Sequence, residues 1–292
     1  MIDSKISSAP SGLSEVDLVR FCSEIFPKEV MYDRFVNEAR FGLSRVLPIL
    51  PSFAAASIEV LEIGAGSCML SAYLASKRLN VTAVEPLGPE FDFFSDLQRR
   101  VLEFCRCKGI ELRLVRATGE ELDLPGQFDV AFTINALEHM RDPLRTIDNM
   151  YKSLKPGGVA LVHCPNYTIP FDSHFNIFLV TRSKRINGWL YRSKINRYSE
   201  VWDELNFVRY VDVQRYLLHR GANFSFDRSI MRDLVVRLVD DPIFALRMPT
   251  IVRVIGAMLR YTGLMGALNW VPVRFQTPME VRIRKDSGPK GQ

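Results

Sequence analysis

Residues 58–69 read Ile-Glu-Val-Leu-Glu-Ile-Gly-Ala-Gly-Ser-Cys-Met. The first six form a mainly apolar run with β-branched side chains, which is typical of a buried strand. Gly64 and Gly66 follow as a tight turn, because glycine adopts positive φ and has no side chain to hold a ligand away. Helical spacing begins directly after the turn, at Met69, Leu70, Tyr73 and Leu74. A strand, a glycine turn and a helix in this order predict a ligand site at the carboxyl end of a parallel strand.

Two acidic residues narrow the choice of ligand. The dinucleotide fingerprint G-x-G-x-x-G would have a third glycine where this chain has Met69. Glu62 instead precedes the first glycine by two residues, and a second apolar strand over 81–84 ends in Glu85-Pro86. An acid about 20 residues after the glycines can accept hydrogen bonds from both hydroxyls of a ribose. This combination resembles the S-adenosylmethionine (SAM) site of class I methyltransferases.

The resemblance continues over residues 58–165. Residues 128–139 resemble the fourth strand of that family and the loop after it, and residues 154–158, Leu-Lys-Pro-Gly-Gly, resemble the turn into its fifth strand. The chain is most similar to the bacterial small-molecule and sugar methyltransferases of the type 11 kind. It departs from the family at Cys68, where a third glycine is frequent, and at Thr118, where many members have an acid near the adenine.

The alternation of strands and helices predicts an α/β fold with a Rossmann-like, doubly wound, mostly parallel sheet. The resemblance implies that the last strand enters antiparallel. Along the chain we expect a helical cap over 1–57, the SAM-binding core over 58–165 and an acceptor-side insertion after strand five over 166–207. Residues 208–292 would complete the sheet and add a helical C-terminal extension, with an amphipathic segment over 242–273.

The resemblance implies SAM as the cofactor and suggests roles for individual residues. Glu62 would orient the amino group of SAM, Glu85 would hold the ribose, and the loop over 116–126 would hold the adenine. Asn135, at the end of strand four, would lie near the methionine part. The predicted cofactor-binding residues are Glu62, Gly64, Gly66, Glu85, Pro86, Thr118, Gly119 and Asn135.

The function predicted from these motifs is transfer of the sulfonium methyl group to a small-molecule or glycan or glycolipid acceptor, with a hydroxyl as the favoured acceptor group. Because the methyl group is already activated, the protein mainly has to align the acceptor with it. Two alternatives stay open at this stage. One is a catalytically silent SAM-fold module that binds a partner or docks on a membrane, and the other is an NAD-dependent oxidoreductase.

Three of the four histidines lie towards the carboxyl ends of adjacent predicted strands. A hydroxyl acceptor benefits from a base near neutral pH, which a histidine supplies. We predict His174, at the start of the insertion, as this base and His139, after strand four, as the second candidate. His163 lies in an apolar strand and is expected to be a core residue. A metal ion on Glu138, His139 and His174 is not required by their spacing, so no metal is assigned.

Two segments outside the common core suggest partners. Between residues 173 and 199 there are six basic residues and no acid, which fits either an anionic acceptor or a solvated face. The basic residues are Arg182, Lys184, Arg185, Arg192, Lys194 and Arg197. In the second segment, over 242–273, most of one helix surface is apolar and Arg253 and Arg260 share a face. This pattern fits a membrane surface, a partner subunit or core packing.

The composition of the chain limits which partners and which cellular location are expected. A net charge of +5 in 292 residues is too small to indicate a nucleic-acid partner. The five cysteines are odd in number and scattered, which favours reduced thiols and a cytoplasmic location. Peripheral contact with the inner membrane face stays open. The sequence has no run of about 20 uncharged apolar residues, so no membrane-spanning helix is expected. The sequence leaves the oligomeric state undetermined.

Overall fold

A computed structural model describes residues 12–26, 33–51, 57–86, 92–246 and 248–287. Its main sheet has seven strands in the order β3-β2-β1-β4-β5-β9-β8, and a separate hairpin pairs β6 with β7. The strands are β1 (Glu59–Ile63), β2 (Asn80–Val84), β3 (Leu112–Val115), β4 (Phe128–Ile134), β5 (Leu154–Cys164), β6 (Phe171–Asp172), β7 (Ile177–Phe178), β8 (Asn223–Phe226) and β9 (Met279–Arg284). The order reverses between β1 and β4, and this is where ligands of doubly wound sheets bind.

Strand directions confirm the expected fold class. β1 pairs in parallel with β2 and β4, and β2 pairs in parallel with β3. β9 runs against β5, because Gly158 O near the start of β5 accepts from Lys285 N just after β9. At the other end, His163 of β5 lies beside Glu280 of β9. The sheet is therefore mostly parallel, as the alternation of strands and helices predicts, and its antiparallel β9 is the one that the family resemblance implies.

Twelve α-helices lie in the described part of the chain. They are α1 (Glu15–Ile25), α2 (Asp33–Val46), α3 (Met69–Ser76), α4 (Asp92–Lys108), α5 (Pro143–Ser153), α6 (Lys184–Leu190), α7 (Arg192–Ile195), α8 (Ser199–Glu204), α9 (Tyr210–Arg220), α10 (Ile230–Asp240), α11 (Pro242–Leu246) and α12 (Thr250–Tyr261). Ser14 caps α1 by accepting from Asp17 N at 3.1 Å. The Tyr73 hydroxyl donates to Ser14 O at 2.9 Å, so α1 is tied to α3.

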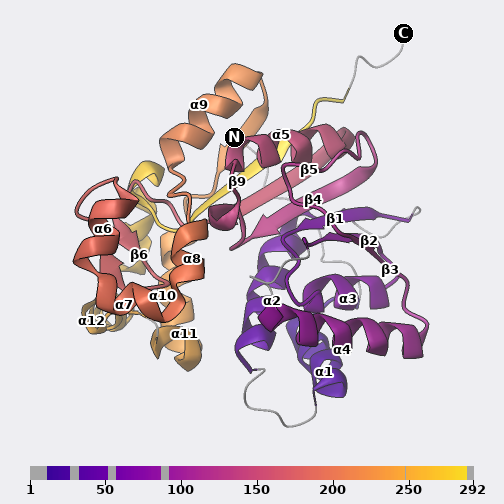
Figure 1. The fold of residues 1–292 in the computed structure, drawn as a ribbon, viewed down its shortest axis with the longest axis horizontal. Coiled ribbons are helices and arrows are strands. Elements are labelled where there is room, and N and C mark those ends of the chain that lie inside the picture. The colour runs from indigo at the N-terminus through magenta and orange to yellow at the C-terminus, as the bar shows by residue number, and fades with distance from the viewer. Residues whose placement is uncertain (1–11, 27–32, 52–56, 87–91, 247, 288–292) are drawn as a thin grey trace. The chain divides into compact units, whose positions relative to one another are not determined.

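The chain divides into two compact units. Unit 1 comprises Met1–Ile134, Arg145–Leu161 and Ile283–Gln292, and unit 2 comprises Asn135–Leu144 and Val162–Arg282. In unit 1 the residues of β1 and β4 are nearly all buried, and Phe132 and Tyr73 are fully buried. Helices α1 to α4 gather on one face of β1–β3, and α5 lies on the other face (Figure 1). The functional regions predicted over 1–57, 58–165, 166–207 and 208–292 stay a prediction, since compactness alone does not test them.

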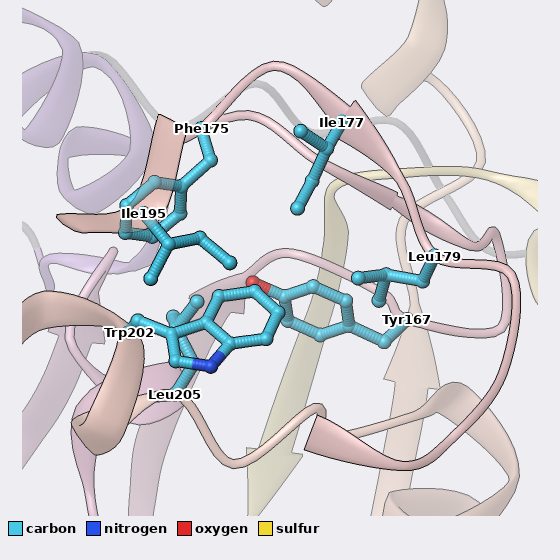
Figure 2. Packing of buried hydrophobic residues seen from close by; sticks show 7 residues of the cluster. All are labelled: Tyr167, Phe175, Ile177, Leu179, Ile195, Trp202 and Leu205. Carbon is cyan, nitrogen blue, oxygen red and sulfur yellow. The ribbon is translucent and has the colours of Figure 1, made fainter. Parts of the chain in front are cut away.

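Unit 2 has a hydrophobic core of its own, which the sequence did not predict. Seven buried side chains of the segment after β5 point toward one another and form this core (Figure 2). They are Tyr167, Phe175, Ile177, Leu179, Ile195, Trp202 and Leu205. The expected long connection over 166–207 is therefore a folded subdomain with the β6–β7 hairpin and α6 to α8. Helix α10 is a further element that the sequence pattern did not indicate.

Candidate functional site

The glycine turn after β1 has the backbone conformation that its sequence predicts. Gly64 has φ 77° and Gly66 has φ 50°, both in the left-handed region that glycine tolerates best. Gly64 N and Ala65 N both donate to Val84 O, at 2.9 and 3.2 Å. These bonds hold the turn against the carboxyl end of β2, so the turn and Glu85 lie side by side.

Glu85 is bonded directly to the turn. Its Oε2 accepts from Gly66 N at 2.8 Å, and Gln98 Nε2 donates to Gly66 O at 2.8 Å. The Glu85 side chain is only 6% exposed. A carboxylate has room for about four hydrogen bonds, so this one can brace the turn and still accept from a ligand hydroxyl.

Cys68 stands where the family often has a third glycine, and its backbone conformation explains that preference. It has φ 60° and precedes α3 as its N-cap. This left-handed conformation is the one that favours glycine, which accounts for the glycine that relatives often have here. The Cys68 side chain is fully buried, and burial raises the pKa of its thiol well above the usual range. Gln98 Nε2 lies 3.4 Å from the sulfur.

Glu62 is a buried acid at the end of β1. Its side chain is 8% exposed and accepts a short hydrogen bond from Ser71 Oγ of α3. Burial raises the pKa of Glu62 to about 8, the charge of Glu85 adds to the rise, and the bond from Ser71 opposes it. A carboxyl group in this state gains from a cationic partner, which the amino group of SAM would be.

The loop predicted to hold the adenine is fixed to α5. Thr118 donates to Glu121 Oε2 through both its backbone N and its hydroxyl, at 3.1 and 3.0 Å. Asn149 Nδ2 of α5 donates to Gly119 O at 3.1 Å. A Cβ at Gly119 would lie 2.6 Å from Thr146 Cγ2, so only glycine fits here. A glycine turn that a ligand can approach closely, beside buried acids that accept hydrogen bonds, fits a nucleoside with an amino-acid tail.

Pro86 follows Glu85 in unit 1, whereas Asn135, His139 and His174 lie in unit 2. Asn135 is exposed, has φ 51° and donates its backbone N–H to His163 O at 2.9 Å. Asparagine tolerates this left-handed conformation better than most residues. Its predicted place near the methionine part of SAM stays a prediction.

The structure brings His139 and His174 together. Glu138 and His139 lie on a short 3-10 helix (Leu137–His139). The rings of His139 and His174 are edge to face, with centroids 5.1 Å apart. One donor atom from each of Glu138, His139 and His174 lies within 4.8 Å of the others. Two imidazoles and a carboxylate at this separation could also hold a divalent metal ion.

His174 is oriented by a buried acid. Its Nδ1 lies 3.2 Å from Asp172 Oδ2, and Asp172 is fully buried. The Tyr167 hydroxyl donates to the same oxygen at 2.7 Å, and Phe175 N donates to Asp172 Oδ1 at 2.9 Å. Burial alone would raise the pKa of Asp172, but the bonds from His174, Tyr167 and Phe175 outweigh it and lower that pKa. An ionised Asp172 favours a proton on Nδ1 of His174, so that Nε2 carries the lone pair.

Asp172 and Tyr167 were missed by sequence reasoning. The only local signal was an acid two residues before His174, and this spacing is common in loops. The contact exists because the β6–β7 hairpin turns His174 back onto Asp172. Tyr167 comes from a different turn of the chain, so no spacing could indicate it.

His139 and His163, the other two histidines of the region, are both largely buried but have different neighbours. Burial, with His174 nearby, lowers the pKa of His139 to about 3, so His139 is neutral at physiological pH. Its Nδ1 lies 3.8 Å from Glu204 Oε2. His163 is 1% exposed and its Nδ1 lies 3.3 Å from Glu280 Oε2, which fits the core position expected from the sequence.

The basic residues of the insertion are mostly on its surface. Lys184 Nζ donates to Asp203 O at 2.6 Å, and Lys194 Nζ donates to Asn176 O at 3.1 Å. These two lysines therefore stabilise the insertion itself. Trp189 and Phe178 are 78% and 61% exposed, so neither belongs to its core.

Comparisons with known proteins agree with this geometry. Residues 32–212 match a family described as a methyltransferase domain. An uncharacterised protein of Mycobacterium tuberculosis is 31% identical over 261 residues, which is 85% of both chains. The ubiquinone biosynthesis O-methyltransferase of Rickettsia conorii is 26% identical over 137 residues, 45% of both chains.

Two solved structures share the fold. Phosphoethanolamine N-methyltransferase 2 of Haemonchus contortus, in complex with SAM, has a TM-score of 0.51 and 15% identity, covering 94% of this chain and 57% of its own. A SAM-dependent methyltransferase of Mesorhizobium loti has a TM-score of 0.51 and 14% identity, covering 85% of this chain and 98% of its own.

Proposed function

We propose that this chain, which belongs to the methyltransferase domain family and is a SAM-dependent methyltransferase, transfers its methyl group to a hydroxyl oxygen. The observation that carries the proposal is the pair of Asp172 and His174, whose Nδ1 and Oδ2 atoms are 3.2 Å apart. An oriented imidazole with a buried carboxylate behind it is suited to accept a proton from a hydroxyl.

SAM supplies a sulfonium methyl group that an oxygen nucleophile can attack. SAM would supply the methyl group, with S-adenosylhomocysteine as its leaving group, and Nε2 of His174 would take the proton that the acceptor hydroxyl gives up. Asp172 stabilises the imidazolium that results, and the Tyr167 hydroxyl keeps Asp172 in place. His139 packs edge to face against His174 and, being neutral, does not add a competing positive charge.

The residues of unit 1 would hold the cofactor in this reaction. The turn at Gly64 and Gly66 would let the backbone approach the methionine end, and Glu62 would bind the amino group. Glu85, with Pro86 beside it, would accept from the ribose. The loop at Thr118 and Gly119 would line the adenine, since α5 holds that loop in one position.

The acceptor is proposed to be a small molecule or a glycan or glycolipid with a free hydroxyl. The partial relatives from Rickettsia are named as O-methyltransferases, which supports oxygen as the acceptor atom. The exposed basic residues of the insertion would favour an anionic acceptor. The five free cysteines fit a reducing compartment and support a cytoplasmic location.

The experiment tests His174 with a matched histidine. Extract from cells that lack the gene is incubated with SAM and enzyme, release of S-adenosylhomocysteine is followed, and mass spectrometry identifies the species that gains a methyl group. We expect His174→Ala to lower the turnover rate well over tenfold, because loss of a general base typically has an effect of this size. Its affinity for S-adenosylhomocysteine should stay within about twofold, because the base acts on the acceptor alone.

His219→Ala is the control, since His219 is exposed on α9 and lies outside the cluster. Wild-type turnover in His174→Ala would remove His174 as the base. Turnover that a chelator abolishes and added metal restores would instead assign Glu138, His139 and His174 to a metal ion. Methylation of a nitrogen or carbon in the identified product would refute the hydroxyl acceptor.

A further inference from the structure

One face of α12 exposes an apolar stripe to solvent. Its residues recur at helical spacing and share a single side of the helix. They are Ile251, Val254, Ile255, Met258 and Tyr261, with exposed fractions of 61%, 48%, 49%, 60% and 94%. Scattered exposed apolar residues are normal, but a contiguous stripe of this kind marks an interaction site.

The opposite side of α12 is already packed. Gly256 is buried there, and a Cβ on it would lie 3.5 Å from both Leu238 and Val235 of α10. The helix is thus fixed to unit 2 through its glycine side, and its apolar stripe faces away from that contact. Packing within unit 2 therefore does not account for the stripe.

The apolar surface continues beyond α12. A 3-10 helix (Leu264–Trp270) follows, in which Leu264 is 57% and Trp270 is 87% exposed. Among the described residues no single helix has the length and hydropathy to cross a membrane, although α12 and this 3-10 helix meet that test together across a bend of 114°. A bend this sharp fits two short helices that lie along a surface.

Charge decides which partner fits. Residues 242–275 contain four arginines and no lysine, aspartate or glutamate. Arg253 and Arg260 are exposed on the same flank of α12, and Arg260 pairs with Asp240 of α10 at 3.0 Å. The segment is therefore net positive, and an anionic surface would attract it. Two copies of this net-positive segment would gain no such attraction.

We propose that α12 and the 3-10 helix Leu264–Trp270 form a docking surface for an anionic lipid bilayer. The helices would lie in the plane of the interface, with the apolar stripe in the acyl boundary and the arginines at the phosphates. Tyr261 and Trp270 would sit at headgroup level, where amphipathic rings are favoured. The proposal is independent of the acceptor and goes beyond the proposed function.

Flotation with vesicles tests the surface. The full chain is mixed at low salt with vesicles of phosphatidylcholine, alone or with phosphatidylglycerol. We expect flotation with the anionic vesicles only, and its loss as salt rises. The double variant Ile255→Glu with Met258→Glu should lower the partition coefficient about tenfold or more, since it places two acids in the stripe.

Leu218→Glu is the matched control, because Leu218 is 64% exposed on α9 and lies outside the surface. It should bind vesicles as the wild type does. Unchanged affinity for S-adenosylhomocysteine would show that each variant is folded. In a Trp189→Phe background, the fluorescence of exposed Trp270 should shift to the blue when anionic vesicles are added.

Three outcomes would overturn the proposal. The first is no flotation at any salt concentration, and the second is equal flotation with neutral vesicles. The third is flotation that the double variant leaves unchanged, because binding would then use another surface. A dimer of the wild-type chain that the double variant dissociates, without vesicle binding, would assign the face to a second copy.

Discussion

At the scale of single residues, Glu85 braces the glycine turn and is predicted to hold the ribose. Glu85→Ala removes the bond to Gly66 N as well as the predicted ligand contact. Loss of a hydrogen bond to a charged group costs about 1.5–3 kcal/mol, or roughly tenfold to a hundredfold in affinity. Calorimetry with S-adenosylhomocysteine measures this loss. Glu103→Ala, at a half-exposed position of α4, is the control, and an equal dissociation constant in both variants would refute the role of Glu85.

Glu62 makes a pH-dependent contribution to stability. Burial raises its pKa to about 8, from the ordinary glutamate value of 4.5. The folded chain therefore binds more protons than the unfolded chain between these values, so the contribution of Glu62 to the free energy of unfolding falls as pH rises through this window. Glu62→Gln should remove that slope. Denaturant unfolding of both proteins at several pH values in the window checks it, and identical slopes would contradict the buried, protonated state.

At the scale of elements, the insertion depends on its own core. Trp202 is 5% exposed and packs against Phe175 and Phe207 with ring centroids 5.6 Å away from each. Trp202→Ala should destabilise this subdomain by about 3–5 kcal/mol, as large-to-small core changes do. Trp189→Ala, at an exposed position of α6, should change stability by less than about 0.5 kcal/mol. Hydrogen exchange of residues 166–207 measures the difference, and equal exchange in the two variants would contradict a shared core.

Features that depend on neighbouring residues could be predicted from the sequence. Features that depend on contacts between distant residues could not. The strand, the turn at Gly64 and Gly66 and the start of α3 follow from neighbouring residues, so the sequence indicated them. The core of the insertion draws on residues from Tyr167 to Leu205 and on two-residue strands too short to show a period. The orientation of His174 depends on Asp172 and on Tyr167, and that contact arises only on folding.

At the scale of the whole molecule, the predicted cofactor residues and the histidine pair fall in different units. All the predicted cofactor residues except Asn135 belong to unit 1, whereas His139 and His174 belong to unit 2. The division separates the residues predicted to bind the cofactor from those proposed to act on the acceptor. Substitution of the histidine pair should therefore leave the free energy of cofactor binding largely unchanged, and substitution of the cofactor residues should leave that of acceptor binding largely unchanged.

Binding of S-adenosylhomocysteine should reflect this division. At 100 times its dissociation constant, the ligand adds about 2.7 kcal/mol to the stability of the state that binds it. We expect slower hydrogen exchange in residues 61–69, 82–86 and 116–121, where the turn, Glu85 and the adenine loop lie. Exchange in α12 should not change, because no predicted ligand contact involves it. His174→Ala should show the same protection as the wild type and Glu85→Ala should show less, whereas protection of α12 as strong as that of the glycine turn would contradict the assignment of cofactor binding to unit 1.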